Sequence, residues 1–150
     1  MSQFTDSELA AIRKAKNILY RALKTGPVFN SPQVVKDYLQ LQIGHLEREV
    51  FGVLYLDAQN RLIEFVIEFQ GTLTQTSVYP REIVKQAITK NAQSVILTHN
   101  HPSGLLEPSR ADELLTQTLK FSLSTVDVRV LDHMIVGVSG AVSFAEKGLI

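Results

Sequence analysis

The segment "SVILTHNHPSG", residues 94–104, decides how the surrounding chain folds. Its first half is a short apolar run bounded by polar residues, which is typical of a strand buried in a sheet. Its second half places His99 and His101 two residues apart, where that strand emerges. Side chains two apart in a strand point to the same side. We therefore expect the two imidazoles to converge on one point while Asn100 faces away.

Helices and strands alternate along the rest of the chain. Helical periodicity, with capping signals at several starts, predicts helices at residues 5–27, 30–44, 81–92 and 109–123. Runs of β-branched and aromatic residues predict strands at residues 50–56, 61–69, 94–98, 126–137 and 141–144. The polar link "DAQN" between the first two strands favours an antiparallel hairpin. The expected fold is α/β, an α/β/α sandwich whose mixed sheet is flanked by helices, with an N-terminal helix.

The composition is that of an ordinary globular domain. Of 150 residues, 45% are hydrophobic and 20% are charged, which is enough for one core. Fifteen basic residues balance fifteen acidic ones, so the charge gives no support to binding of nucleic acid or an anionic membrane. The start "MSQFTDSELA" has no apolar signal-peptide core, and no apolar run reaches membrane-spanning length. We expect a cytoplasmic protein with no membrane partner.

A carboxylate, Asp112, follows the two histidines at a spacing that allows it to lie beside them in the fold. The chain has no cysteine, so a metal site must use imidazole nitrogen and carboxylate oxygen. After His101 a short Pro/Gly-bearing loop leads to Ser109 and Asp112 in the first turn of a helix, which can swing Asp112 back beside the imidazoles. Two histidines and one carboxylate leave a tetrahedral zinc ion one open position for water. Glu49, just before a buried strand, is the candidate that takes the proton from that water.

Several stretches resemble a known family. The spacing His-x-His, seven residues, Ser, two residues, Asp resembles the metal-binding signature of the JAMM (MPN-type) metalloprotease fold, and "EVFGVL" resembles the strand whose glutamate completes it. "GTLTQTSVYPRE", "NHPSG", "PSRAD", "LDHMIVG" and "FAEKGL" resemble the RadC-like branch, so the likeness runs from about residue 31 to residue 150. The resemblance implies an N-terminal helical extension over residues 1–28. It also implies an MPN (JAMM, RadC-like) domain of cytidine-deaminase-like fold over residues 29–150.

The resemblance also implies chemistry. His99, His101 and Asp112 would be the zinc ligands, Glu49 the general base and acid, and Ser109 a partner of the tetrahedral oxyanion. The implied activity is that of a zinc metallopeptidase that cleaves an amide or isopeptide bond in a peptide or protein. The protease signature has Ser or Thr between the two histidines, whereas this chain has Asn100, as RadC-like proteins do. This difference argues against ubiquitin-type substrates but not against metal binding. Longer RadC-like chains carry helix-hairpin-helix motifs that bind DNA, and this sequence has one amphipathic helix ahead of the domain.

The same residues allow other interpretations. Ser109 and Asp112 also stand at the N-cap and N3 positions of a helix, so capping alone favours them, and both roles can hold together. His133 falls within a predicted strand, where a structural or supporting role is favoured over ligation. A non-haem iron oxygenase also uses two histidines and a carboxylate, but generally in an all-β barrel. A non-catalytic module that associates with DNA or protein is motivated by the DNA-repair label of the RadC-like proteins and opposed by the balanced charge.

Overall fold

The computed structural model describes residues 3–25, 29–72 and 77–150, with backbone alone at residues 22–25. The elements are α1 (Asp6–Thr25), α2 (Pro32–Ile43), β1 (Val50–Leu56), β2 (Leu62–Gln70), α3 (Pro80–Thr89), β3 (Ser94–Asn100), α4 (Arg110–Ser124), β4 (Arg129–Val136) and β5 (Ala141–Ser143). Each predicted helix and strand is present. The predicted stop of the first helix at Gly26-Pro27 lies outside the described residues.

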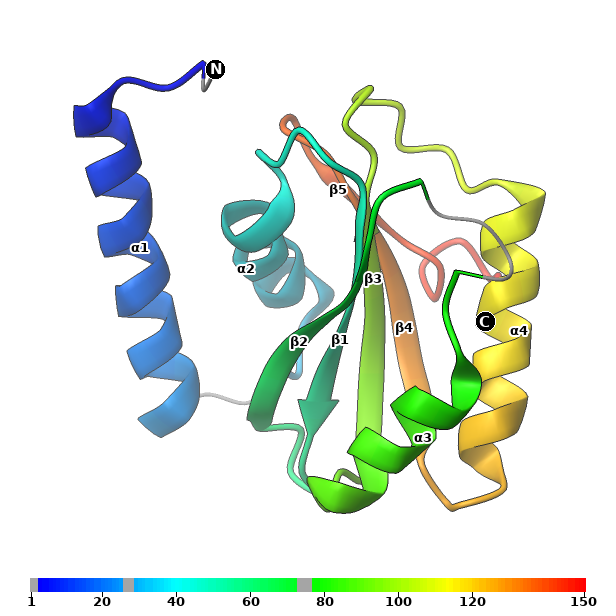
Figure 1. Ribbon diagram of the computed structural model, residues 1–150. Helices are drawn as coiled ribbons and strands as arrows, with labels where there is room; N and C mark the ends of the chain where they lie inside the picture. The colour runs from blue at the N-terminus through cyan, green and yellow to red at the C-terminus, as the bar shows by residue number, and fades with distance from the viewer. Residues whose placement is uncertain (1–2, 26–28, 73–76) are drawn as a thin grey trace.

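The five strands form one mixed sheet in the order β2-β1-β3-β4-β5. The pair β3 and β4 is parallel, and the other three pairs are antiparallel. Helix α2 covers one face, with α1 packed outside it against α2 and β2, and α3 and α4 cover the other face (Figure 1). The α/β sandwich with a mixed sheet and an N-terminal helix is therefore confirmed. Within the described residues, none of these helices has the length and apolar character needed to cross a membrane.

Period-2 alternation divides the core into two clusters, one on each face of the sheet. The cluster under α3 and α4 includes Phe51, Val53 and Leu97, and the cluster under α2 includes Leu54 and Ile96. Both faces are covered, so every residue of β1 and β3 is buried. This explains why the run before the histidines is apolar at every position rather than at alternate ones.

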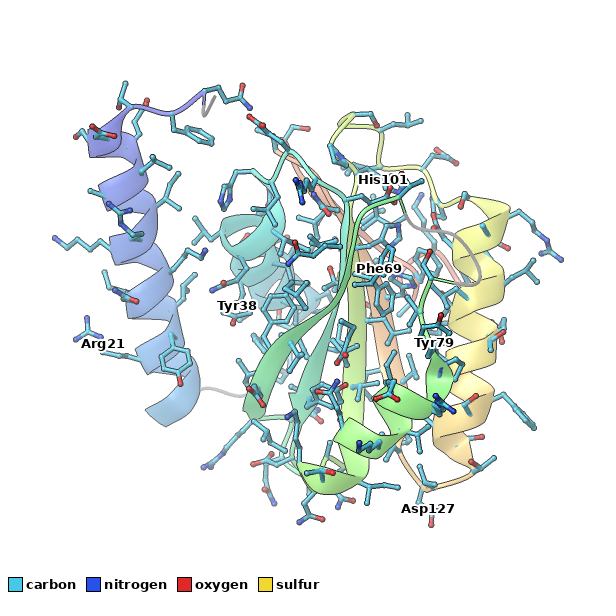
Figure 2. The ribbon with its side chains drawn as sticks, in the orientation of Figure 1. Arg21, Tyr38, Phe69, Tyr79, His101 and Asp127 are labelled. Atoms are coloured by element: carbon cyan, nitrogen blue, oxygen red, sulfur yellow. The ribbon has the colours of Figure 1, made fainter. Side chains whose placement is uncertain are left out.

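The connection from β3 to β4 determines which residues meet at the end of the sheet. Two adjacent parallel strands need a crossover connection. Helix α4, which follows β3 and precedes β4 in the sequence, supplies it by running back along the sheet. The N-terminus of α4 must therefore lie at the end of the sheet where β3 finishes. Figure 2 labels His101 at this end of the molecule and Asp127, which follows α4, at the opposite end. The loop after β3 thus brings the first turn of α4 beside the histidines.

Strand β4 contains a bulge that changes which side chains face α4. Val95 pairs with Val130, but the next residue, Ile96, pairs with Asp132, so Leu131 is an extra residue in the ladder. Val130 belongs to the core cluster under α3 and α4, and the ring of His133 makes a T-shaped contact with Phe51 from that same cluster. Residues three apart share one face only because the bulge shifts the alternation.

Candidate metal centre

The structure brings together all three residues predicted to bind metal. His99 lies in β3, His101 follows the strand directly, and Asp112 lies in the first turn of α4. The two Nε2 atoms are 2.9 Å apart. Asp112 Oδ1 lies 3.4 Å from His99 Nε2, and Asp112 Oδ2 lies 3.8 Å from His101 Nε2. His99 is fully buried and Asp112 nearly so, which makes this a polar cluster at the edge of the core.

Glu49 approaches the same cluster from β1. It immediately precedes the strand, two residues before Phe51, so its side chain points to the same face of the sheet as that of Phe51. Phe51 pairs with His99 in the antiparallel ladder. One carboxylate oxygen of Glu49 and one ring nitrogen from each of His99 and His101 lie within 4.8 Å of one another. The predicted proton carrier therefore lies on the same face of the sheet as the predicted ligands.

The hydrogen-bond partner of His101 determines the direction of its lone pair. His101 Nδ1 lies 2.5 Å from the carbonyl oxygen of Leu105, and a carbonyl only accepts, so Nδ1 carries the proton. The other ring nitrogen, Nε2, then faces His99 Nε2 and Asp112. Atoms bound to a tetrahedral zinc ion at about 2.0–2.1 Å are about 3.4 Å apart, close to the separations seen here. The donor set therefore fits a zinc ion.

Asp112 also caps the helix that carries it. Ser109 Oγ accepts a hydrogen bond from the Asp112 amide at 3.1 Å, and Asp112 Oδ2 accepts one from the Ser109 amide at 2.8 Å. This is the capping box that the sequence predicted. Burial raises the pKa of Asp112, but the hydrogen bonds and charge of His99 and the two bonds with Ser109 outweigh it and hold that pKa well below its usual value. Asp112 is thus an ionised and rigidly held carboxylate.

Two carboxylates approach the imidazoles. Asp112 Oδ1 lies 3.4 Å from His99 Nε2, and its two oxygens face different ring nitrogens. Glu49 also reaches both histidines, and Glu49, His99 and His101 form a group that could hold a metal ion. The assignment of Asp112 as the ligand and Glu49 as the proton carrier stays the prediction made from the sequence.

Asn100, to which the sequence analysis assigned no chemistry, holds the segment that carries Glu49. Its side chain points to the opposite face, where Oδ1 accepts from the Val50 amide at 2.7 Å. Its Nδ2 donates to the carbonyls of Leu46 at 3.3 Å and Arg48 at 2.9 Å. These bonds bracket Glu49 on both sides. The residue between the two histidines thus fixes the backbone of a third site residue.

Truncation of Asn100 should destabilise the fold. Asn100→Ala leaves the buried Val50 amide without its side-chain acceptor, and we expect a loss of about 1–3 kcal/mol in the free energy of unfolding. Urea titration followed by circular dichroism measures this change. Asn17→Ala, on the exposed surface of α1, is the control and should change stability by less than about 0.5 kcal/mol. Equal behaviour of the two variants would show that Asn100 does not hold this segment.

Behind His99 lies a histidine that does not face the cluster. His133 is fully buried, with Nε2 2.8 Å from His99 Nδ1 and Nδ1 2.6 Å from Thr116 Oγ1. Its ring stacks on Phe144 with centroids 4.6 Å apart. Burial lowers the pKa of His133 well below its usual value, and the charge of His99 lowers it further. One ring nitrogen thus bonds to the far side of the His99 ring and the other to Thr116, so a supporting role for His133 stays the prediction made from the sequence.

Thr116 was missed by sequence reasoning. It is fully buried, and its hydroxyl donates to the Asp112 carbonyl at 2.7 Å. One signal was present in the sequence, because Thr116 lies four residues after Asp112 and so on the same face of the helix. A polar residue in the buried stripe of a helix needs a partner. The sequence did not show that the partner would be His133.

Comparison with known proteins agrees with this architecture. The family model of the RadC-like JAB domain matches residues 29–149. A UPF0758 protein of Leptothrix cholodnii is 59% identical over 145 residues, covering 96% of this chain and 65% of the relative. UPF0758 proteins of Methylibium petroleiphilum and Aromatoleum aromaticum are 59% and 57% identical, covering 96% and 94% of this chain. The chain spans 65% and 63% of the length of these two relatives. With most of its length matched, the chain belongs to the RadC-like JAB domain family.

Proposed function

We propose that this chain is a zinc-dependent hydrolase that cleaves amide or isopeptide bonds in a peptide or protein substrate. One observation carries the proposal. The ionised Asp112 and the Nε2 atoms of His99 and His101 converge at 2.9–3.8 Å, with the Glu49 carboxylate beside them. These three residues would hold the zinc ion. Its oxygen and nitrogen donors, with no thiolate, match the catalytic class of zinc site.

A zinc ion held by His99, His101 and Asp112 would polarise a substrate carbonyl and lower the pKa of a bound water from about 15.7 to about 7. The protein must then move protons and hold charge. Glu49 accepts a proton from the attacking water and delivers it to the amine nitrogen as the C–N bond breaks. Asn100 holds the Glu49 backbone for this transfer through its bonds to Val50 and Arg48.

Ser109 has a proton available for the oxyanion. Its oxygen accepts a hydrogen bond from the Asp112 amide, and this bond does not use the hydroxyl proton, which can therefore be donated to another group. It stands at the N-terminus of α4, where the helix dipole favours developing negative charge. A donor in this position supports the oxygen that becomes negative when the water attacks. Capping and oxyanion support use different atoms of Ser109, so both roles are compatible.

The proposal is tested by zinc-dependent release of amines. The purified chain, loaded with zinc, is incubated with a mixture of peptides and of lysine-linked isopeptides, and new amino groups are detected with fluorescamine. We expect release that stops with 1,10-phenanthroline and returns with zinc, and His99→Ala should show none. A zinc-loaded chain that releases no amine and binds duplex DNA in a salt-sensitive manner would contradict the proposal and favour a non-catalytic module.

A further inference from the structure

A buried chain of hydrogen bonds runs from one proposed ligand to the helix that carries another. His99 Nδ1 lies 2.8 Å from His133 Nε2, and His133 Nδ1 lies 2.6 Å from Thr116 Oγ1. Thr116 Oγ1 lies 2.7 Å from the carbonyl oxygen of Asp112. The side chains of His99, His133 and Thr116 are all fully buried. We call these contacts the buried hydrogen-bond chain.

The last acceptor of the buried hydrogen-bond chain determines which atom donates in each of its bonds. The Asp112 carbonyl only accepts, so Thr116 donates its single hydroxyl proton there. The Thr116 oxygen then accepts from His133 Nδ1–H. A neutral His133 with its proton on Nδ1 has a lone pair on Nε2, which accepts from His99 Nδ1–H. In this direction His99 keeps its proton on Nδ1, so Nε2, which faces Asp112, is the nitrogen that binds a metal ion once it gives up its own proton.

We infer that His133 and Thr116 are positioning residues that hold His99 in its metal-binding tautomer. The inference rests on the proposed zinc centre and adds two residues that do not touch the ion. Histidine ligands in general donate their second N–H to an oxygen acceptor. Here the acceptor is the His133 imidazole, which in turn donates its Nδ1–H to the oxygen of the Thr116 hydroxyl.

The fold fixes the ring of His133 from every side. The bulge at Leu131 turns His133 towards His99, and Asp132 secures this turn by accepting from the His133 amide at 2.7 Å and the Ala145 amide at 3.0 Å. The ring stacks on Phe144 and makes a T-shaped contact with Phe51. An apolar residue would be buried there at a lower cost in free energy, because a buried polar group is unfavourable unless it is hydrogen-bonded. Both bonds are made here, and one of them is to His99.

The buried hydrogen-bond chain also joins three elements that must stay aligned. His99 lies in β3 and His133 in β4, whereas Thr116 and Asp112 lie in α4. Because the last bond ends on the backbone of Asp112, the chain links a ligand from the sheet to a ligand from the helix. Loss of the Thr116 hydroxyl should therefore weaken metal binding without removing any ligand.

Valine in place of Thr116 is the test, because it keeps the shape and removes the hydroxyl. Zinc dissociation constants are measured by competition with a chromogenic chelator. We expect Thr116→Val to weaken zinc binding by about 10–100-fold, and Thr116→Ser, which restores the hydroxyl, to stay within about threefold of wild type. Thr118→Val is the matched control, since Thr118 makes the same kind of bond to the Leu114 carbonyl at 3.0 Å but is exposed. It should bind zinc as wild type does.

A second variant and a spectrum distinguish positioning from simple packing. His133→Phe fills the space between Phe51 and Phe144, so the metal-free fold should persist while zinc affinity falls at least as far as in Thr116→Val. In ¹⁵N spectra of the zinc-loaded wild type, His133 should carry its proton on Nδ1. A proton on Nε2 of His133 would overturn the inference.

The outcomes separate this inference from the proposed function. If wild type binds zinc and Thr116→Val binds it as tightly as Thr118→Val, the positioning role is wrong and the zinc centre stands. Thermal unfolding of the metal-free variants is measured alongside. Lower stability of Thr116→Val with unchanged zinc affinity would show a structural role alone and would also overturn the inference. If wild type does not bind zinc, the proposed function fails and this inference fails with it.

Discussion

Replacing Glu49 with glutamine is expected to lower amide-bond turnover by about 10²–10⁴-fold while leaving the zinc content unchanged. Glutamine has nearly the same shape as glutamate but cannot take a proton from water at neutral pH. The proposed ligands are untouched, so the zinc site should remain intact. The measurement is kcat/KM for amine release from a cleaved substrate, with zinc determined by elemental analysis on the same sample.

Glu47→Gln is the matched control for this experiment. Glu47 lies two residues earlier in the same segment and is exposed. Because an exposed carboxylate is solvated, its loss should leave kcat/KM at the wild-type level. Full activity in Glu49→Gln would reject the assignment of the base. Loss of zinc in that variant would instead make Glu49 a ligand.

Asp112→Ala is expected to reduce the zinc content from about one ion per chain to a small fraction, because two imidazoles alone form an incomplete site. The same change removes the acceptor of the Ser109 amide, and loss of this cap should cost about 1 kcal/mol of stability. Asp112→Asn separates the two effects. Its amide oxygen can still accept from Ser109, but it lacks the charge that a zinc ligand supplies. We expect it to lose zinc while keeping most of the stability.

Glu113→Ala provides the control for Asp112. Glu113 is the next carboxylate in the first turn of α4 and pairs with Arg110 at 3.5 Å on the surface. Its removal should leave the zinc stoichiometry at the wild-type value and change stability by less than about 1 kcal/mol. Zinc content in Asp112→Ala equal to that in Glu113→Ala would show that Asp112 does not bind the metal.

Local patterns in the sequence were sufficient to predict the fold class and the meeting of the histidines. A buried strand that ends in His-x-His must present both imidazoles on one face, and the structure places them 2.9 Å apart. A helix that follows this strand after a short loop must begin at the end of the sheet where the strand finishes, and this brings Asp112 to them. Both rules depend only on strand geometry and chain connection. The roles of these residues, and the division of the chain at residue 28, stay predictions.

Features that depend on register could not be predicted. The extra residue Leu131 in β4 leaves no trace in the periodicity of "VRVLDHMIV", yet it turns His133 towards His99. The partnership of Thr116 with His133 likewise depends on how α4 packs on the sheet. Asn100 could be placed on the far face, but its bonds to the segment around Glu49 join residues fifty positions apart. Such contacts follow from tertiary packing rather than from local sequence.

Anomalous diffraction at the zinc edge from crystals of the zinc-loaded chain tests the central claim most directly. We predict one strong peak about 2.0–2.2 Å from His99 Nε2, His101 Nε2 and an oxygen of Asp112, with Glu49 facing the remaining position. A peak at any other place, or one whose carboxylate ligand is Glu49 instead of Asp112, would contradict the account.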